Sequence, residues 1–211
     1  VKMNILSIIF LVIIAYILGS IPNALWIGKV FRGIDIREHG SKNTGSTNAA
    51  RVLGGKLGIL TLILDVSKGA IPLILAIFLE KDLIKNSINS NTILILIGIW
   101  SIIGHSFSIF LNFKGGKAVA TTLGVFIVLV PKSILVAAIV FFAVFAMFKY
   151  VSLSSILSSV TLPIAIFLIE KNLAYTLFSI LISVLIILKH KDNIKRLLNG
   201  RETKFEMKSK K

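Results

Sequence analysis

Long apolar stretches, separated by short polar segments, occupy almost the whole chain. A membrane-spanning helix needs about 20 mostly apolar residues. Three stretches reach this length. Four more, of about 12–16 residues, are short for a full crossing unless the bilayer thins or nearby loops help. The predicted spans are 5–27, 57–79, 93–111, 119–130, 133–148, 154–169 and 173–188. This pattern predicts an all-α integral membrane protein with about seven transmembrane helices in one membrane-embedded domain, 1–211.

The segment 119–148 can be interpreted as one long bent helix or as a hairpin of two short helices. The hairpin, with the N-terminus outside, puts 18 of the 24 Lys and Arg residues on the cytoplasmic side. A single bent helix would put the basic tail, 189–211, outside, against the preference of Lys and Arg for the cytoplasm. We therefore predict the hairpin, with Pro131 at its turn, because proline cannot continue a helix interior.

The composition agrees with a membrane protein. Hydrophobic residues make up 55% of the chain and charged residues only 16%, with a mean hydropathy of +0.92. No soluble polar module carries the net charge of +15, so we expect no nucleic-acid partner. The absence of cysteine excludes thiol nucleophiles and disulfides. The apolar run at the N-terminus is too long for a signal peptide, so we expect a retained helix.

The predicted topology places all the polar, glycine-rich segments on the cytoplasmic side. These segments are 33–51, 112–118, 149–155 and 189–202. Although they are far apart in sequence, four loops at one face of a membrane can build a single site.

The first polar loop contains small hydroxyl and amide side chains between glycines. Such sequences favour tight turns with exposed N–H groups, which bind anions. An arginine at the end of the loop adds a planar donor suited to phosphate. The alternative is an ordinary solvated loop, since polar loops are common. The candidate site residues here are Gly40, Ser41, Asn43, Thr47, Asn48 and Arg51.

The second polar loop has Gly115, Gly116 and Lys117 just before an apolar span. Unpaired N–H groups and the positive end of the helix dipole lie at such a position, so the arrangement suits phosphate. The spacing is not that of the nucleotide P-loop. The alternative is a basic anchor at a helix end.

Three further polar side chains lie within the predicted spans. His105, near the cytoplasmic end of the third span, is either a helix-packing hydrogen bonder or a site residue. Asp65 and Lys68 share a helix face, and we expect mainly a structural ion pair that borders the site. Lys68 and His105 are therefore included among the candidate substrate contacts.

The last two polar segments contribute two pairs of candidates. Ser152 and Ser155 lie at the start of the sixth span, where a serine can instead simply cap the helix. His190 and Asn193 share one face if the last helix continues. His190 can serve as acid, base or phosphate donor near neutral pH. The surrounding basic residues alone would indicate only binding to anionic lipid heads.

Together these segments resemble the bacterial acyl-phosphate:glycerol-3-phosphate acyltransferase family, the PlsY type. The matches occur in family order over nearly the whole chain, which makes the set far more specific than any single motif. They are Gly19-Ser20-Ile21-Pro22, Gly40-Ser41-x-Asn43-x-Gly45-x-Thr47-Asn48-x-x-Arg51, Asp65-x-x-Lys68-Gly69, Gly104-His105-x-Phe107, Phe113-Lys114-Gly115-Gly116-Lys117, Ser152-Leu153-x-Ser155 and His190-x-x-Asn193. The chain departs from the usual pattern at Lys42 and Ala118 (both usually Gly), Ser46 (Ala) and Ser108 (Pro).

The resemblance implies a multi-pass enzyme of the bacterial cell membrane with its site facing the cytoplasm. The implied reaction moves an acyl group from acyl phosphate to the 1-position of glycerol 3-phosphate, giving lysophosphatidic acid and phosphate. Active-site positions of the family map onto Ser41, Arg51, Lys117, Ser155, His190 and Asn193. We expect membrane lipids around a monomer. We also expect no cofactor and no metal, since the motifs hold few carboxylates and the chain has three histidines.

The residues suit this chemistry. Acyl phosphate is already activated, so no covalent nucleophile is needed, and direct attack by the glycerol hydroxyl requires positioning, a proton acceptor and oxyanion stabilisation. We expect Lys117 with the Gly115 and Gly116 amides to hold one phosphate. Arg51 with Ser41 would hold the other, and His190 with Asn193 would orient the substrate. The proton acceptor is either His190 or a phosphate oxygen.

Three alternatives stay open. An acyltransferase using acyl-CoA or acyl carrier protein would carry H-x-x-x-x-D, but Thr44, Phe110 and Lys195 stand at the fifth position after the three histidines. A membrane transporter of a phosphorylated metabolite would tend to show pseudo-symmetric halves, and the sequence has no repeat. A structural membrane protein would leave the ordered motifs unexplained.

Overall fold

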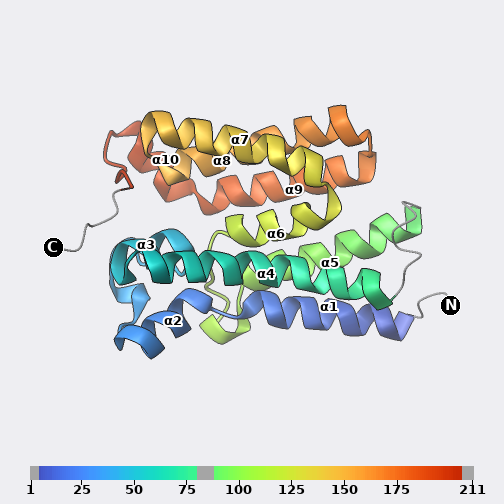
Figure 1. Ribbon diagram of the computed structural model, residues 1–211, viewed down its shortest axis with the longest axis horizontal. Coiled ribbons are helices and arrows are strands. Elements are labelled where there is room, and N and C mark those ends of the chain that lie inside the picture. Colours follow the sequence, from blue (N-terminus) through green and yellow to red (C-terminus); the bar gives the residue numbers. More distant parts are fainter. Residues whose placement is uncertain (1–4, 80–87, 206–211) are drawn as a thin grey trace. The chain divides into compact units, whose positions relative to one another are not determined.

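Figure 1 shows the computed structural model, which describes residues 5–79 and 88–205. All the regular elements within these ranges are helices, which confirms the predicted all-α class. Segments 1–4, 80–87 and 206–211 lie outside the described residues. They include part of the predicted outer charges, Lys2, Lys81 and Lys85, and the end of the basic tail.

The chain divides into two compact units, Val1–Leu129 and Val130–Lys211. The division falls at the predicted hairpin, because one helix ends at Leu129 and the next begins at Pro131. Proline suits a first helical position, where the missing N–H has no helical partner. Segment 119–148 is therefore not one continuous helix, and the hairpin stays a prediction. A single functional domain over 1–211 stays a prediction.

The first unit contains six α-helices and two short 3-10 turns among its described residues. Helix α1 packs against α5, and the long α4 packs against α3 and α6. In chain order the elements are α1 (Ile5–Ser20), α2 (Asn23–Arg32), η1 (Ile36–Glu38), α3 (Ser46–Leu53), α4 (Gly55–Leu79), α5 (Ile88–Ser106), η3 (Ile109–Leu111) and α6 (Val119–Leu129).

Glycines allow two of these helix pairs to approach closely. A Cβ added at Gly19 or Gly104 would lie within 2.4 Å of a carbonyl oxygen on the facing helix of the α1–α5 pair. Gly69 and Gly124 have the same role between α4 and α6, because an added Cβ would lie 2.1 and 2.0 Å, respectively, from a carbonyl oxygen of the facing helix. Small residues are characteristic of helix contacts in membranes, where close backbone approach drives association.

The first predicted span is broken. Helices α1 and α2 meet at an angle of 44°, so the expectation of one helix over 5–27 is wrong. Pro22, which has no N–H, lies two positions after the end of α1 and directly before α2. The break is held from α4. The Asn23 side chain donates to Asp65 Oδ1 at 2.9 Å, and Lys68 Nζ donates to the Ile21 carbonyl at 2.8 Å.

The second unit is built on three long helices. Helix α8 packs against both α7 and α9. The elements are α7 (Pro131–Phe148), α8 (Val151–Ala165), a π-helical continuation (Ile166–Glu170), α9 (Leu173–Lys189) and α10 (Lys191–Leu198). A bend of 60° separates α9 from α10, so the last span does not continue straight past Lys189.

Each of the seven predicted spans contains a helix, but their lengths differ from expectation. Among the residues that the structure describes, four helices are long enough and apolar enough to cross a bilayer alone, and up to six spans result when each bent pair counts as one. The remaining helix, α6, has 11 residues and is short, as predicted. Helix α8 starts earlier than predicted, at Val151, because serine hydroxyls inside it bond to backbone carbonyls and need no solvent. Ser154 donates to Tyr150 O and Ser155 to Val151 O.

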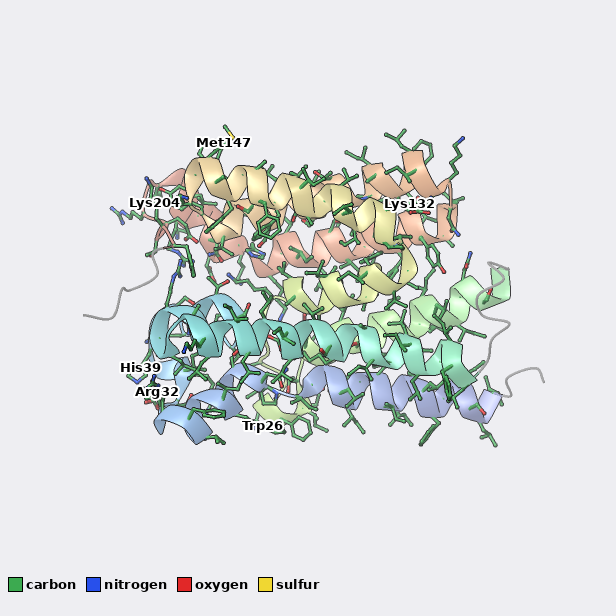
Figure 2. The ribbon with its side chains drawn as sticks, in the orientation of Figure 1. Trp26, Arg32, His39, Lys132, Met147 and Lys204 are labelled. Carbon is green, nitrogen blue, oxygen red and sulfur yellow. The ribbon has the colours of Figure 1, made fainter. Side chains whose placement is uncertain are left out.

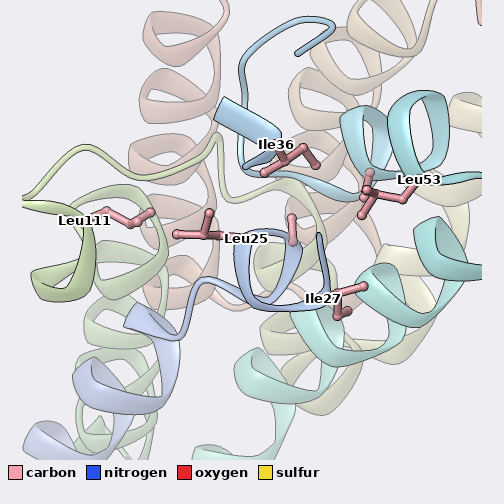
Figure 3. Packing of buried hydrophobic residues seen from close by; sticks show 7 residues of the cluster. Leu25, Ile27, Ile36, Leu53 and Leu111 are labelled. Carbon is pink, nitrogen blue, oxygen red and sulfur yellow. The ribbon is translucent and has the colours of Figure 1, made fainter. Parts of the chain in front are cut away.

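An apolar cluster lies beneath the polar loops of the first unit (Figure 3). It joins residues from α2, η1, α3 and η3. Its buried members are Ala24, Leu25, Ile27, Ile36, Ala49, Leu53 and Leu111. Two loops separated by more than fifty residues of sequence therefore rest on one hydrophobic base.

Candidate functional site

The first polar loop is organised around the side chain of Asn48, which is 1% exposed. Its amide group donates to the carbonyls of Ile36, His39 and Asn43 at 3.2, 3.1 and 3.0 Å. Its oxygen accepts from the Ser41 N–H at 2.8 Å. These contacts give Asn48 a structural role, and its direct contact with a substrate phosphate stays a prediction.

Part of this segment is a helix, where the sequence predicted only a loop. Helix α3 begins after Gly45 and contains Thr47, Asn48 and Arg51. A helix this short is stabilised chiefly by packing, here of Ala49 and Leu53 on the apolar cluster. The expectation of a polar loop over the whole segment 33–51 is therefore wrong, and Arg51 is presented from a helix.

Gly40 and Ser41 form the exposed tip of this segment. Gly40 has φ +59°, and a Cβ there would lie 2.4 Å from Asn48 Oδ1, so both backbone and space require glycine. The Ser41 side chain is exposed, whereas Arg51 is half-buried. The predicted roles of Ser41, Asn43, Thr47 and Arg51 at phosphate stay predictions.

The amides of Gly115 and Gly116 do not form the expected phosphate cradle. The Gly115 N–H donates to Ser106 O at 3.2 Å, and the Gly116 N–H donates to His105 O at 3.0 Å. Since both donors are used to fold the loop back on the end of α5, this part of the prediction is corrected. The loop instead presents Lys117, which is half-buried, just before α6.

His105 supports this loop from below and is 6% exposed. Its Nδ1 lies 3.1 Å from Thr121 Oγ1 and 3.9 Å from Asp65 Oδ1. A Cβ on Gly116 would lie 2.3 Å from His105 Nε2, and a Cβ on Gly115 would lie 2.0 Å from the His105 carbonyl oxygen. The two glycines are thus required for close packing on His105. A contact of His105 with substrate stays a prediction.

The predicted ion pair of Asp65 and Lys68 is present. Lys68 Nζ lies 2.9 Å from Asp65 Oδ1, and both side chains are buried. Lys68 also donates to the Ile21 carbonyl, so both of these contacts are with the protein itself. A direct contact of Lys68 with phosphate stays a prediction.

In the second unit, Glu202 joins the third polar segment to the fourth. Its Oε1 accepts from Ser152 Oγ at 2.7 Å and from Asn193 Nδ2 at 2.6 Å, and its Oε2 accepts from Arg196 Nε at 2.7 Å. Burial raises the pKa of Glu202, but the hydrogen bonds from Asn193, Ser152 and Arg196 together lower it by more. The pKa of Glu202 therefore lies below its ordinary value. Glu202 was not among the predicted site residues. The available signal was weak: Glu202 is one of the few acidic residues in a tail rich in Lys and Arg.

The residues after Glu202 pack against the turn between α7 and α8, which fixes the position of Glu202. The Phe205 N–H donates to Lys149 O at 2.8 Å, and the Phe205 ring lies 5.9 Å from that of Phe145. Lys204 Nζ lies 5.9 Å from the ring centroid of Tyr150. These contacts connect the chain beyond α10 to the start of α8.

His190 lies at the bend between α9 and α10 and is 3% exposed. Its Nδ1 lies 2.8 Å from the Ile186 carbonyl. A carbonyl can only accept, so Nδ1 carries the hydrogen, and in the neutral ring Nε2 holds the lone pair. Asn193 follows in the first turn of α10 and is buried, although α9 does not continue as one helix through it.

The serines of the third segment divide in role. Ser152 reaches Glu202, whereas the Ser155 hydroxyl donates to Val151 O within its own helix. Neither is an N-cap, because the helix begins after Tyr150, whose side chain makes no capping hydrogen bond. The structure thus brings the first two polar segments together in one unit and the last two in the other. A single site formed from all four stays a prediction.

Comparison with known proteins identifies the family. A family model described as glycerol-3-phosphate acyltransferase matches residues 9–200. The chain belongs to the glycerol-3-phosphate acyltransferase family. It is 46% identical over 195 residues to the glycerol-3-phosphate acyltransferase of Fusobacterium nucleatum subsp. nucleatum, covering 92% of this chain and 96% of that protein. It is also 46% identical over 203 residues to glycerol-3-phosphate acyltransferase 2 of Bacillus anthracis, covering 96% of this chain and 100% of that protein.

Solved structures agree with this assignment. The structure is similar to that of PlsY (YgiH), an integral membrane glycerol 3-phosphate acyltransferase, in its glycerol 3-phosphate form, with a TM-score of 0.86 and 40% identity. The match covers 95% of this chain and 96% of PlsY. The lysophosphatidic acid form of PlsY matches with a TM-score of 0.84. The chain is thus an acyltransferase and an integral membrane protein, and the transporter and structural-protein alternatives are set aside.

Three of the four departures from the usual family sequence keep the backbone that the usual residue would adopt. Lys42 and Ala118, which replace glycines, have φ +57° and +58°, the left-handed region that glycine favours. Ser108, which replaces proline, has φ −66°, the angle to which proline is fixed. Ser108 also donates through its hydroxyl to Ser20 O at 2.5 Å, a contact that proline cannot make.

Proposed function

We propose that this acyltransferase uses acyl phosphate as its donor and releases lysophosphatidic acid and phosphate. Glycerol 3-phosphate would be the acceptor, at its 1-position. The observation that carries the proposal is the 40% identity, over 95% of the chain, to an enzyme solved in both a glycerol 3-phosphate form and a lysophosphatidic acid form.

The choice of donor follows from what the chain lacks. It has no cysteine to form a thioester, and none of its three histidines begins the H-x-x-x-x-D signature of the acyltransferases that use thioester donors. Acyl phosphate needs neither, because its mixed anhydride already carries a good leaving group. The glycerol hydroxyl can therefore attack the acyl carbon directly, forming the ester C–O bond while the bond to phosphate breaks.

Cationic and hydroxyl side chains of the first unit would hold the two phosphorylated molecules. Lys117, at the end of the folded-back loop, and Arg51, on α3, supply the positive charge, with the exposed Ser41 beside the Asn48-centred turn. In this proposal the loop glycines act by packing on His105, and their amides are not phosphate ligands. Positive charge aimed at the departing phosphate lowers the barrier by stabilising the charge that develops there.

His190 and Asn193 of the second unit would act on the attacking hydroxyl. The hydrogen bond from His190 Nδ1 to the Ile186 carbonyl leaves the lone pair at Nε2, which is the form that a general base requires. Asn193 is oriented by Glu202, which accepts from its amide nitrogen. A substrate phosphate oxygen is the competing proton acceptor. We further propose that the site faces the cytoplasm, where the positive-inside rule places most of the basic residues.

Purified protein with its site residues replaced one at a time tests these roles. Lys117→Ala and Arg51→Ala should each reduce kcat/KM for lysophosphatidic acid formation at least about a hundredfold, because a charge-assisted contact to phosphate is removed. Lys132→Ala, an exposed lysine at the start of α7, is the matched control and should leave the rate unchanged. Normal rates in both Lys117→Ala and Arg51→Ala would contradict the assignment of phosphate binding.

His190→Ala separates the two proton acceptors. If His190 is the base, the rate falls and the dependence of kcat/KM on a group titrating near neutral pH disappears. A rate close to that of the unsubstituted enzyme assigns the proton to a substrate phosphate oxygen instead.

A further inference from the structure

An exposed surface of the first unit combines aromatic, aliphatic and basic side chains. It is formed by the outer face of α2 and by the turn that follows α5, and we call it the aromatic–basic surface. Its members are Trp26, Lys29, Val30, Phe31 and Arg32 from α2, and Phe107, Ile109, Phe110, Phe113 and Lys114 from the turn.

Helix α2 has one face in the protein and one face outside it. Leu25 and Ile27 are buried in the apolar cluster. On the other side, Trp26, Val30 and Phe31 are 46%, 77% and 59% exposed. The outer face is therefore apolar and largely exposed.

The turn after α5 extends the same surface. Phe110 and Phe113 are 50% and 60% exposed. The rings of Trp26 and Phe110 lie 5.9 Å apart, so the two segments form one continuous patch. The turn is anchored, because Tyr16 donates through its hydroxyl to the Phe107 carbonyl at 3.0 Å.

The charges on this surface have one sign. Lys29, Arg32 and Lys114 are exposed, and neither 23–32 nor 107–114 contains an acidic residue. The next acidic residue after α2, Asp35, is paired with Arg37 at 2.6 Å. Figure 2 shows Trp26 and Arg32 at the surface of this unit.

The direction of α2 is fixed by buried contacts. It turns 44° away from α1, and the bonds from Asn23 to Asp65 and from Lys68 to the Ile21 carbonyl hold the break. Aromatic rings concentrate where lipid meets water. Helices with one apolar face and basic flanks lie along that boundary, and anionic lipids attract the basic side chains.

We propose that the aromatic–basic surface lies at the water–lipid boundary and binds the headgroups of anionic phospholipids. Helix α2 would then lie along the membrane surface and would not complete the span begun by α1. The inference goes beyond the proposed function, because it concerns membrane lipid and holds whichever acyl donor the enzyme uses. Its consequence is that the Asn48-centred segment, which follows α2, is held at headgroup depth.

Fluorescence of Trp26 tests this directly, because the chain contains only two tryptophans. Trp100→Phe leaves Trp26 as the single reporter and keeps an aromatic ring beside Tyr16. This protein is reconstituted into vesicles with either phosphatidylglycerol or phosphatidylcholine brominated at a shallow or a deep acyl position. Shallow bromines should quench Trp26 more than deep ones. Brominated phosphatidylglycerol should quench Trp26 more than brominated phosphatidylcholine at equal mole fraction. Each basic side chain near the lipid charge should enrich phosphatidylglycerol locally by up to about fivefold.

Charge removal supplies the second arm. Lys29→Gln/Arg32→Gln/Lys114→Gln should abolish the preference for phosphatidylglycerol and leave quenching by shallow brominated phosphatidylcholine unchanged. Lys132→Gln/Lys149→Gln/Lys171→Gln removes three exposed basic residues of the second unit and should keep the preference. Raising the ionic strength of the Trp100→Phe sample should also weaken the preference for phosphatidylglycerol, without further substitution.

Two results would overturn the proposal. Equal quenching by the two lipids at low ionic strength would show that the basic residues select no headgroup. Maximal quenching by deep bromines would show that α2 continues the span into the hydrocarbon core.

Discussion

At the scale of single residues, both residues that replace the family's usual glycines hold left-handed backbone at the edges of the candidate site. Lys42, at φ +57°, is exposed, and Ala118, at φ +58°, is 1% exposed. The sequence alone identified both as departures from the family's glycines. It could not show that the backbone keeps the glycine conformation, because that depends on the packing of the whole loop.

We expect Ala118→Gly to stabilise the protein. A left-handed alanine destabilises the folded state by about 1–2 kcal/mol, and glycine removes this cost. Glycine also makes the unfolded chain more flexible, which offsets part of the effect, so the free energy of unfolding should rise by up to about 1 kcal/mol. The measurement is the midpoint of thermal unfolding in one detergent. The control is Ala120→Gly, two positions further along in α6, which should destabilise by about 1 kcal/mol. A lower midpoint for Ala118→Gly would contradict the backbone assignment.

At the scale of elements, the sequence predicted the apolar helices well and the polar ones poorly. Asp65 and Lys68 lie on one helix, so their spacing alone predicted the ion pair. Helix α3 escaped prediction because its stability comes from Ala49 and Leu53 in a distant cluster. Glu202 escaped because its contacts with Asn193 and Arg196 form across the end of α10, and its contact with Ser152 joins residues fifty positions apart. Local patterns carry no information about such contacts.

The buried pair should be strongly coupled. Lys68→Met leaves the Asp65 carboxylate buried without its cation and should cost about 3–5 kcal/mol. Adding Asp65→Asn removes that uncompensated charge and keeps an oxygen to accept from Asn23, so the double variant should be more stable than Lys68→Met alone. Thermal unfolding of the wild type, both single variants and the double variant gives the coupling. Strict additivity would argue against a direct pair.

The Glu202 contacts should depend on pH. The native pKa of Glu202 is lowered, so its contribution to stability is complete above the ordinary glutamate pKa of about 4.3 and is lost as pH falls through the lower native value. Glu202→Gln should therefore lower the unfolding midpoint at pH 7, by a free energy of about 1–2 kcal/mol. The difference between variant and wild type should close below about pH 4. An unchanged difference throughout the acid range would show that the charge of Glu202 is not what matters.

At the scale of the whole molecule, the account requires the polar segments of both units to face the same compartment. The chain has no cysteine, so single cysteines can be labelled without background. In intact cells an impermeant maleimide should label Lys132→Cys but neither Lys114→Cys nor Asn199→Cys, because hydrophobic helices separate the last two from the outer face. Permeabilised cells should show labelling at all three positions. Labelling of Lys114→Cys and Asn199→Cys from opposite sides would rule out a shared site.

Family membership and helical architecture followed from ordered motifs and apolar length. The proposed donor concerns the chemical step itself, so turnover is the measurement that tests it. The most direct measurement is lysophosphatidic acid formation by the purified protein from labelled glycerol 3-phosphate, with acyl phosphate or acyl-CoA as the only donor. We expect product with acyl phosphate, one phosphate released for each ester formed, and no product with acyl-CoA. Product from acyl-CoA and none from acyl phosphate would contradict this expectation.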